Sequence, residues 1–238
     1  MTGIGSGAVL SLDLKISANI AKEENARVAE LIGINKAARV TTVKPSGTSS
    51  LVLGTSSGIH AWHNSHYVRR IRVGKNEAIY NYLAINHPEL VEDDFFKPTI
   101  QAVISVPQKA PEGSILRTEN VIDMLERVKK FNMQWVKKGH RKGANTNNVS
   151  ATVSINEDEW EQVGKWMWEN KDTFNGLSVL PYFGGSYVQA PFEDITEEQF
   201  NELSQHLHNI DLSKIIEFTD NTSLMENLAC SGGSCEIV

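Results

Sequence analysis

The sequence predicts a protein of the α/β class. Its 238 residues are 40% hydrophobic and 22% charged, which is typical of a globular protein with a substantial core. Short β-branched runs alternate along the chain with amphipathic helical patterns. In the second half the order is strand, long helix, strand, helix, strand, which favours parallel pairing through helical crossovers. We therefore expect one α/β body over residues 1–217.

Five elements are predicted in the first half of the chain. The first helix is rich in Ala, Glu, Lys and Arg, with apolar residues at helical spacing and Gly33 just past its end. The strands are apolar or β-branched runs bounded by turn residues, and Pro107 closes the last of them. The predicted elements are a helix over residues 16–32, strands over 40–43 and 67–73, a short helix over 76–83 and a strand over 100–106.

Five more elements are predicted in the second half. Two helices carry apolar stripes, whose aromatic side chains we assign to helix packing. Thr196 is a typical N-cap, and Glu197 and Glu198 suit the first turn that follows. The elements are a helix over 119–138, a strand over 149–155, a helix over 157–170, a strand over 177–182 and a helix from 196. The stripes are Met124, Val128, Phe131 and Trp135, and Trp160, Val163 and Met167.

Charge and hydropathy exclude several classes of partner. The net charge is −6 and the pI is about 5.7, which disfavours DNA or RNA binding. No apolar run approaches the length of a bilayer span, and the N-terminus lacks a cationic region followed by an apolar stretch. We therefore expect a cytoplasmic protein that does not enter a membrane.

The two cysteines, Cys230 and Cys235, lie in a polar tail that we place at residues 218–238. So few cysteines exclude a disulfide-rich secreted scaffold, and zinc needs about four ligands, so no metal site is expected. The Ser-Gly-Gly-Ser spacer lets the two sulfur atoms meet, so a flexible pair of this kind could exchange with other thiols. The alternative is a chance pair at a frayed terminus.

A loop rich in small hydroxyl residues, VKPSGTSS, follows the strand predicted at residues 40–43. Ligands of α/β proteins bind beyond the carboxyl ends of strands, and such a loop offers N–H and O–H donors to phosphate oxygens. The loop is not a Walker motif, because its Lys precedes the glycine. A plain surface turn is the alternative.

The segment SSGIHAWHNSHYVRRIRVGK carries the densest basic strip of this acidic chain. Arginine pairs well with phosphate, whereas a solvated strand face would need no ligand. Histidines recur there every three residues, but no carboxylate or cysteine completes a metal-ligand set. The basic residues are Arg69, Arg70, Arg72 and Lys75, and the histidines are His60, His63 and His66.

These segments, in this order, resemble the C-terminal part of the adenosylcobalamin-dependent ribonucleoside-triphosphate reductases. The matching stretches are RVTTVKPSGTSSLV, SSGIHAWHNSHYVRRIRV, VPQKAPEG, NNVSATVSINEDEW, GLSVLPY, YVQAPFEDIT and CSGGSC. Members of this family have a ten-stranded α/β barrel and reduce the ribonucleotide 2′-hydroxyl with a thiyl radical, which homolysis of the cobalt–carbon bond generates. The resemblance therefore implies the C-terminal part of such a barrel, followed by a flexible redox tail.

The resemblance also implies roles for individual residues. The residues that match the family's substrate-phosphate loop are Pro45, Ser46, Gly47, Thr48 and Ser49. Those that match a stretch near the substrate and cofactor are Ser57, Gly58, His60, Arg69 and Arg70. Cys230 and Cys235 match the pair that passes electrons from a thioredoxin-like reductant to the active-site disulfide. The implied ligands are a ribonucleoside triphosphate substrate and adenosylcobalamin.

One departure from the family is decisive for activity. The family's thiyl-radical cysteine and two further cysteines lie inside the barrel, whereas this chain has no cysteine before Cys230. We therefore expect no activity of the chain alone, which would be a piece of a split enzyme with a complementary chain that holds the rest of the barrel, a truncated gene product or a remnant. The resemblance covers roughly the last third of a full reductase and about half of the barrel strands, so we also expect open sheet edges and unburied apolar faces. Three alternatives remain: a non-catalytic assembly subunit, a fragment of the reductase class with a separate radical-generating subunit, and a free-standing nucleotide-binding module.

Overall fold

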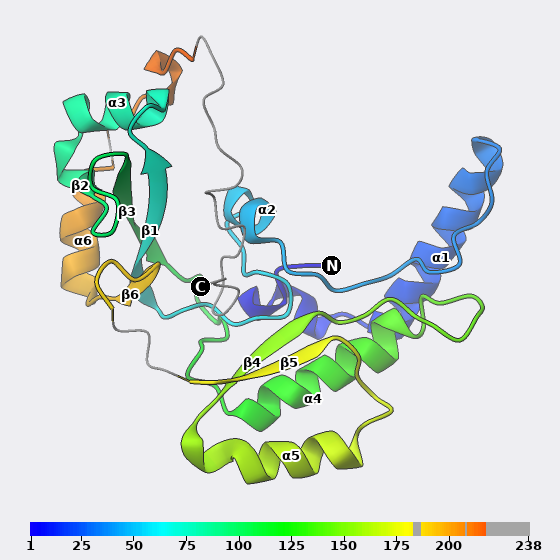
Figure 1. Ribbon diagram of the computed structural model, residues 1–238. Helices are drawn as coiled ribbons and strands as arrows, with labels where there is room; N and C mark the ends of the chain where they lie inside the picture. The colour runs from blue at the N-terminus through cyan, green and yellow to red at the C-terminus, as the bar shows by residue number, and fades with distance from the viewer. Residues whose placement is uncertain (183–186, 208, 218–238) are drawn as a thin grey trace.

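The computed structural model describes residues 1–182, 187–207 and 209–217, whose strands form two separate sheets (Figure 1). One sheet has four antiparallel strands in the order β2-β3-β1-β6, and the other is the parallel pair β4-β5. The strands are β1 (His66–Gly74), β2 (Val91–Asp93), β3 (Gln101–Lys109), β4 (Ala151–Ile155), β5 (Leu177–Pro181) and β6 (Phe192–Asp194). The α-helices are α1 (Leu14–Leu31), α2 (Gly47–Val52), α3 (Ala78–Asn86), α4 (Val121–Phe131), α5 (Trp160–Glu169) and α6 (Glu197–Gln205).

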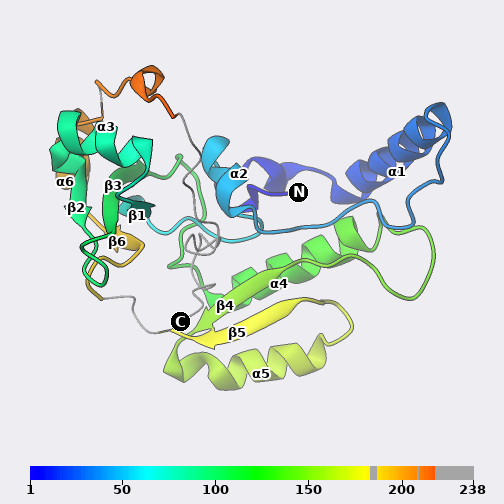
Figure 2. The same cartoon turned by 45° about the horizontal axis from the view of Figure 1, so that its top comes forward.

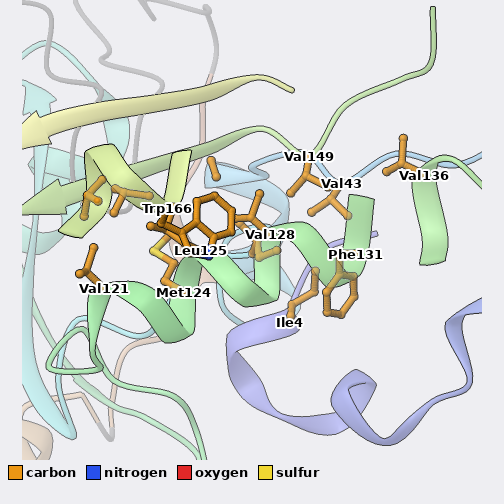
Figure 3. Close-up of a cluster of buried hydrophobic side chains, with 14 of the residues drawn as sticks. Ile4, Val43, Val121, Met124, Leu125, Val128, Phe131, Val136, Val149 and Trp166 are labelled. Carbon is orange, nitrogen blue, oxygen red and sulfur yellow. The ribbon is translucent and has the colours of Figure 1, made fainter. Parts of the chain in front are cut away.

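The larger core lies where α4 and α5 pack against the parallel pair (Figures 2 and 3). Alternate β4 residues are buried against the helices, as expected for a strand with one covered face. Leu125, Val128 and Phe131 form the apolar stripe of α4 and are fully buried. Ile4 joins the same cluster, so the N-terminal segment is packed into the core that supports β4.

A smaller core belongs to the antiparallel sheet. β1 and β3 pair over their whole lengths, from His66 opposite Lys109 to Gly74 opposite Gln101. The buried residues of this core come from β1, β3 and α3, and they are Val73, Leu83, Ala102 and Ile104. This sheet carries the basic strip of the sequence.

The sequence predicts parallel pairing for the three strands that are β3, β4 and β5 here, and the structure confirms it for two of them. Strands β4 and β5 pair in parallel, whereas β3 lies in the other sheet, antiparallel to β1. Nor does Pro107 end β3, which continues to Lys109. Ala110 donates its N–H to the Ser65 carbonyl oxygen, just before β1. Backbone groups alternate along a strand, so Pro107 faces the other edge of β3, at a position that β2 does not reach. A residue without an N–H is tolerated there.

Three further expectations differ in detail from the structure. The segment 40–43 forms no strand and contributes one isolated bridge, from Val43 to Val149, which is parallel. The helix expected over 119–138 is α4 followed by a π-helical turn at Asn132–Val136. On α5, the predicted stripe residue Trp160 is exposed, whereas Trp166 is buried. Trp166 packs on Phe174 and donates its Nε1–H to Glu126.

The other expected elements are confirmed within a few residues. The cap at Thr196 is also confirmed: its hydroxyl accepts from the Gln199 N–H, and the Gln199 side chain accepts from the Thr196 N–H. The predicted tail and both cysteines lie outside the described residues. A barrel closed on itself is not seen in the described part of the chain.

Helix α1 projects from the body with two apolar faces (Figure 1). Leu14, Ala18 and Ala29 are buried, whereas Ile16, Ile20 and Leu31 are more than half exposed. The expected unburied apolar face is therefore present on this helix. Among the described residues, no helix has the length and apolar character needed to cross a membrane.

Candidate functional site

The predicted phosphate residues lie in a compact loop, residues 45–58, whose two ends touch. This Ω-shaped loop contains the short helix α2 and is closed by a neck at Gly58. Gly58 has φ +59°, and a Cβ atom there would lie 3.0 Å from the Lys44 carbonyl oxygen and 3.1 Å from the Pro45 nitrogen. The Ser46 N–H donates to the Ser57 hydroxyl across the same neck at 3.1 Å. Glycine is therefore required for the loop to close.

The N-terminal segment forms hydrogen bonds with both sides of this neck. Gly3 and Ile4 donate their N–H groups to the carbonyl oxygens of Ser56 and Gly58, each at 3.0 Å. The Thr2 hydroxyl lies 2.6 Å from the Ser46 hydroxyl and accepts the Gly58 N–H at 2.8 Å. We call this set of hydrogen bonds between the N-terminal segment and the neck the clasp. It joins residues more than forty positions apart in the sequence.

Ser6 extends the same clasp at the C-terminal end of the loop. Its hydroxyl lies 2.9 Å from that of Thr55, accepts the Ser56 N–H at 3.0 Å and accepts the indole N–H of Trp62 at 2.9 Å. The contacts of Thr2 and Ser6 were not predicted from the sequence. Their only signal is the run of small residues in MTGIGSG, which has no periodicity to predict a partner.

His60 ties the neck to the parallel sheet. Its Nε2 accepts the N–H of Thr152 on β4 at 3.0 Å, so the ring proton is on Nδ1, which lies 3.0 Å from the Ser57 carbonyl oxygen. Burial lowers the pKa of His60 below its usual value. The imidazole is therefore neutral, and its two hydrogen bonds fix the tautomer with the proton on Nδ1.

The loop itself presents small polar groups outward. Pro45 and Ser49 are exposed, Ser46 and Gly47 are half-buried, and the side chain of Thr48 lies outside the described atoms. Ser46 makes no side-chain cap to α2, because its hydroxyl is paired with Thr2. Hydroxyl and amide donors of this kind suit a phosphate group, which offers only acceptors at neutral pH.

The structure does not join the basic strip into one cationic surface. Arg70 lies 2.6 Å from a Glu193 carboxylate oxygen, and the shortest ion pairs of Arg72 and Lys75 are equally direct, at 2.9 Å to Asp94 and 2.5 Å to Asp93. Arg69 has no carboxylate partner among the described residues and lies over the Phe192 ring, with its centre 5.7 Å from the ring centroid. The predicted site residues therefore divide between the loop neck, with Ser57, Gly58 and His60, and strand β1, with Arg69 and Arg70.

A second, partly exposed cluster joins β1 and the segment before it, β6, and the segment before α4. Asp194 lies 2.6 Å from Arg117 and 3.1 Å from Nε2 of His63. Burial, with the nearby Arg117 guanidinium, lowers the pKa of His63 to about 4. Burial also raises the pKa of Tyr67, which packs edge-on to His63, to about 12. Both rings are uncharged at neutral pH, so they stabilise packing at this junction.

Potential metal ligands do not gather in the described part of the chain, where no group of three or more His, Cys, Asp or Glu residues is close enough to hold an ion. The three histidines that recur every three residues in the sequence contact three different partners. His60 bonds to backbone, His63 stacks on Phe192 and His66 packs against Phe200.

Comparison with known proteins agrees with the resemblance seen in the sequence. The chain is 26% identical over 217 residues to an adenosylcobalamin-dependent ribonucleoside-triphosphate reductase of Lactobacillus delbrueckii, covering 88% of this chain and 28% of that protein. The reductase of the same name from Euglena gracilis is 28% identical over 223 residues, covering 91% and 29%. The chain resembles the adenosylcobalamin-dependent reductases over most of its length. The sequence-based resemblance is thus confirmed.

A solved structure supports the same conclusion for the fold. A B12-dependent (class II) ribonucleotide reductase matches with a TM-score of 0.72 and 20% identity, over 90% of this chain and 33% of the reductase chain. The α/β class is confirmed, and the fold is that of part of this reductase. No family model matches the sequence. The chain spans less than a third of the length of the curated reductases.

Replacement of Gly58 by Ala tests the closed neck, with Gly54→Ala as a matched control. Both glycines have φ +59°, but a Cβ at position 54 would meet nothing within 4 Å. Gly54→Ala should cost about 1 kcal/mol for the left-handed backbone. Gly58→Ala should cost about 1–3 kcal/mol more, because its methyl group would press on the Lys44–Pro45 backbone. Urea unfolding measures both, and equal losses would contradict the neck geometry.

The lowered pKa of His60 predicts that the free energy of unfolding depends on pH. Because its folded pKa lies below the unfolded value of about 6.5, the unfolded chain binds the proton first, and the free energy of unfolding falls as pH drops below about 6.5. The slope between pH 7 and pH 5 should be smaller in His60→Gln, which cannot titrate. The variant His206→Gln serves as a surface control, and the prediction is wrong if His60→Gln keeps the wild-type slope in urea unfolding.

Proposed function

We propose that this chain supplies the C-terminal part of a ribonucleotide-reducing centre. In this proposal the loop at residues 45–49 binds the phosphates of a ribonucleoside triphosphate, and Cys230 with Cys235 re-reduces the active site. The main support is the similarity to ribonucleoside-triphosphate reductases over 88% of the chain, which includes the whole loop and its neck. Because the chain covers 28% of that relative, the proposal concerns one share of the enzyme.

The charge distribution around the loop favours a phosphate ligand. Residues 31–76 include no Asp or Glu and seven Lys or Arg, in a chain whose net charge is −6. Four of the seven lie on or beside β1, and Arg70, Arg72 and Lys75 among them are paired with carboxylates. Lys44 is exposed and directly precedes the loop, so it provides positive charge where hydroxyl and amide donors converge.

The second part of the proposal is a dithiol relay. The two thiols of Cys230 and Cys235 would reduce an active-site disulfide on the complementary chain by thiol–disulfide exchange, becoming a disulfide themselves. A thioredoxin-like dithiol then reduces that tail disulfide by the same reaction and is itself oxidised. Two electrons pass at each exchange, and the protons pass between thiol and thiolate.

Adenosylcobalamin enters the proposal only through the relatives, which depend on it by name. When bound, this cofactor supplies a carbon radical by homolysis of its cobalt–carbon bond. The described histidines near the loop do not fit a cobalt-ligating role: both ring nitrogens of His60 bond to backbone, and Nε2 of His63 faces Asp194. We assign no step on this chain to the cofactor.

The thiyl radical must also come from outside these residues, because no cysteine precedes Cys230. A complementary chain with the remaining barrel strands and the radical cysteine is therefore part of the proposal. Affinity purification of the native chain, with mass spectrometry of what accompanies it, identifies that polypeptide. Formation of deoxynucleotides by the isolated chain would contradict this part.

Binding of a ribonucleoside triphosphate to the full chain tests the phosphate loop. Ser49→Asp places a negative charge on the exposed face of the loop, so the dissociation constant should rise at least about tenfold. Ser11→Asp puts the same charge on another exposed serine and should change affinity less than twofold. Calorimetric titration measures both. Equal affinities for wild type and Ser49→Asp would refute the assignment.

Cys230→Ser and Cys235→Ser test the relay in the copurified complex. Turnover with a thioredoxin donor should be lost in each variant, because one thiol cannot form an internal disulfide. Turnover with a small dithiol should persist, because that reductant reaches the active-site disulfide directly. Unchanged turnover with thioredoxin would favour a purely structural subunit instead.

A further inference from the structure

One hydroxyl group at the neck of the loop touches both of its ends. Thr2 Oγ1 lies 2.6 Å from Ser46 Oγ, accepts the Gly58 N–H at 2.8 Å and lies 3.4 Å from the Ser56 carbonyl oxygen. The Ser46 N–H also donates to the hydroxyl of Ser57, the residue before Gly58. The position of the Ser46 side chain thus depends on a residue from outside the loop.

The direction of these hydrogen bonds affects what Ser46 can offer a ligand. Gly58 donates to Thr2, and the single Thr2 proton can go either to Ser46 Oγ at 2.6 Å or to the Ser56 carbonyl oxygen at 3.4 Å. When this proton goes to Ser46 Oγ, the Ser46 hydroxyl keeps its own proton for another acceptor. A phosphate oxygen is such an acceptor, so an anion at the loop favours this arrangement of the chain Gly58–Thr2–Ser46.

We propose that Thr2 is a positioning residue for the phosphate loop, acting through Ser46 and Gly58. This inference rests on the proposed function, since it assumes that the loop binds phosphate. Thr2 need not touch the ligand: it holds the Ser46 hydroxyl in place and sets which way that hydroxyl donates. The loop would therefore be complete only when the N-terminal segment is seated on its neck.

The test compares Thr2→Val with Thr2→Ser in the full chain, using inorganic tripolyphosphate as the probe. Valine has the shape of threonine without the hydroxyl, so it leaves the Gly58 N–H without an acceptor and releases Ser46. Its dissociation constant should rise about five- to tenfold, whereas Thr2→Ser should stay within twofold of wild type. Thr173→Val removes a hydroxyl that donates to Asn170 at the end of α5 and controls for a general loss of stability.

The outcomes separate this inference from the function on which it rests. If the wild-type chain fails to bind tripolyphosphate and nucleoside triphosphate, the phosphate loop itself is refuted, and the inference with it. If wild type binds and Thr2→Val binds equally well, only the inference is overturned. If Thr2→Val unfolds, the comparison rests on Thr2→Ser. The inference is overturned if Thr2→Ser binds tripolyphosphate at least fivefold more weakly than wild type. It is supported if Thr2→Ser binds with wild-type affinity and Thr173→Val also leaves binding unchanged.

Discussion

The backbone contact between Gly58 and Lys44–Pro45 is the constraint on which the candidate site depends. A side chain at position 58 would have to occupy space already taken by that backbone, so the loop closes only around a glycine in the left-handed region. Closure brings Ser46 and Ser57 together and holds the loop as a compact unit. From the same neck the chain runs on through His60 and Trp62 to β1.

Two distant parts of the chain converge on this neck. The N-terminal segment supplies Thr2 and Ser6, and β4 supplies the Thr152 N–H to His60. Because the N-terminal segment also contributes Ile4 to the core beneath β4, the clasp and the sheet are parts of one packed unit. Substitutions far from the loop in sequence can therefore alter its shape, whereas the exposed face of α2 can vary with little effect on it.

Charge is distributed so that one basic region is neutralised and another remains open. The arginines of β1 look in sequence like an anion-binding strip, yet Arg70 and Arg72 meet carboxylates from β6 and from the turn after β2. These pairs link β1 to β6 and to the turn after β2. Lys44 is exposed and lies in a stretch of sequence without acidic residues, which makes the loop the better candidate for an anionic substrate.

The sequence by itself determined the local features: the stripe of α4, the N-cap at Thr196, the positions of β1, β3, β4 and β5, and the small-residue loop after residue 43. These depend on neighbours within a few positions, where periodicity and capping chemistry act. The order of the matching motifs also determined the resemblance to the reductases. Only the tertiary structure decided the antiparallel direction of β3, the carboxylate partners of Arg70 and Arg72 and the hydrogen bond between Thr2 and Gly58. Each of these joins residues at least 22 positions apart, and no local pattern specifies which distant partner will satisfy a given donor.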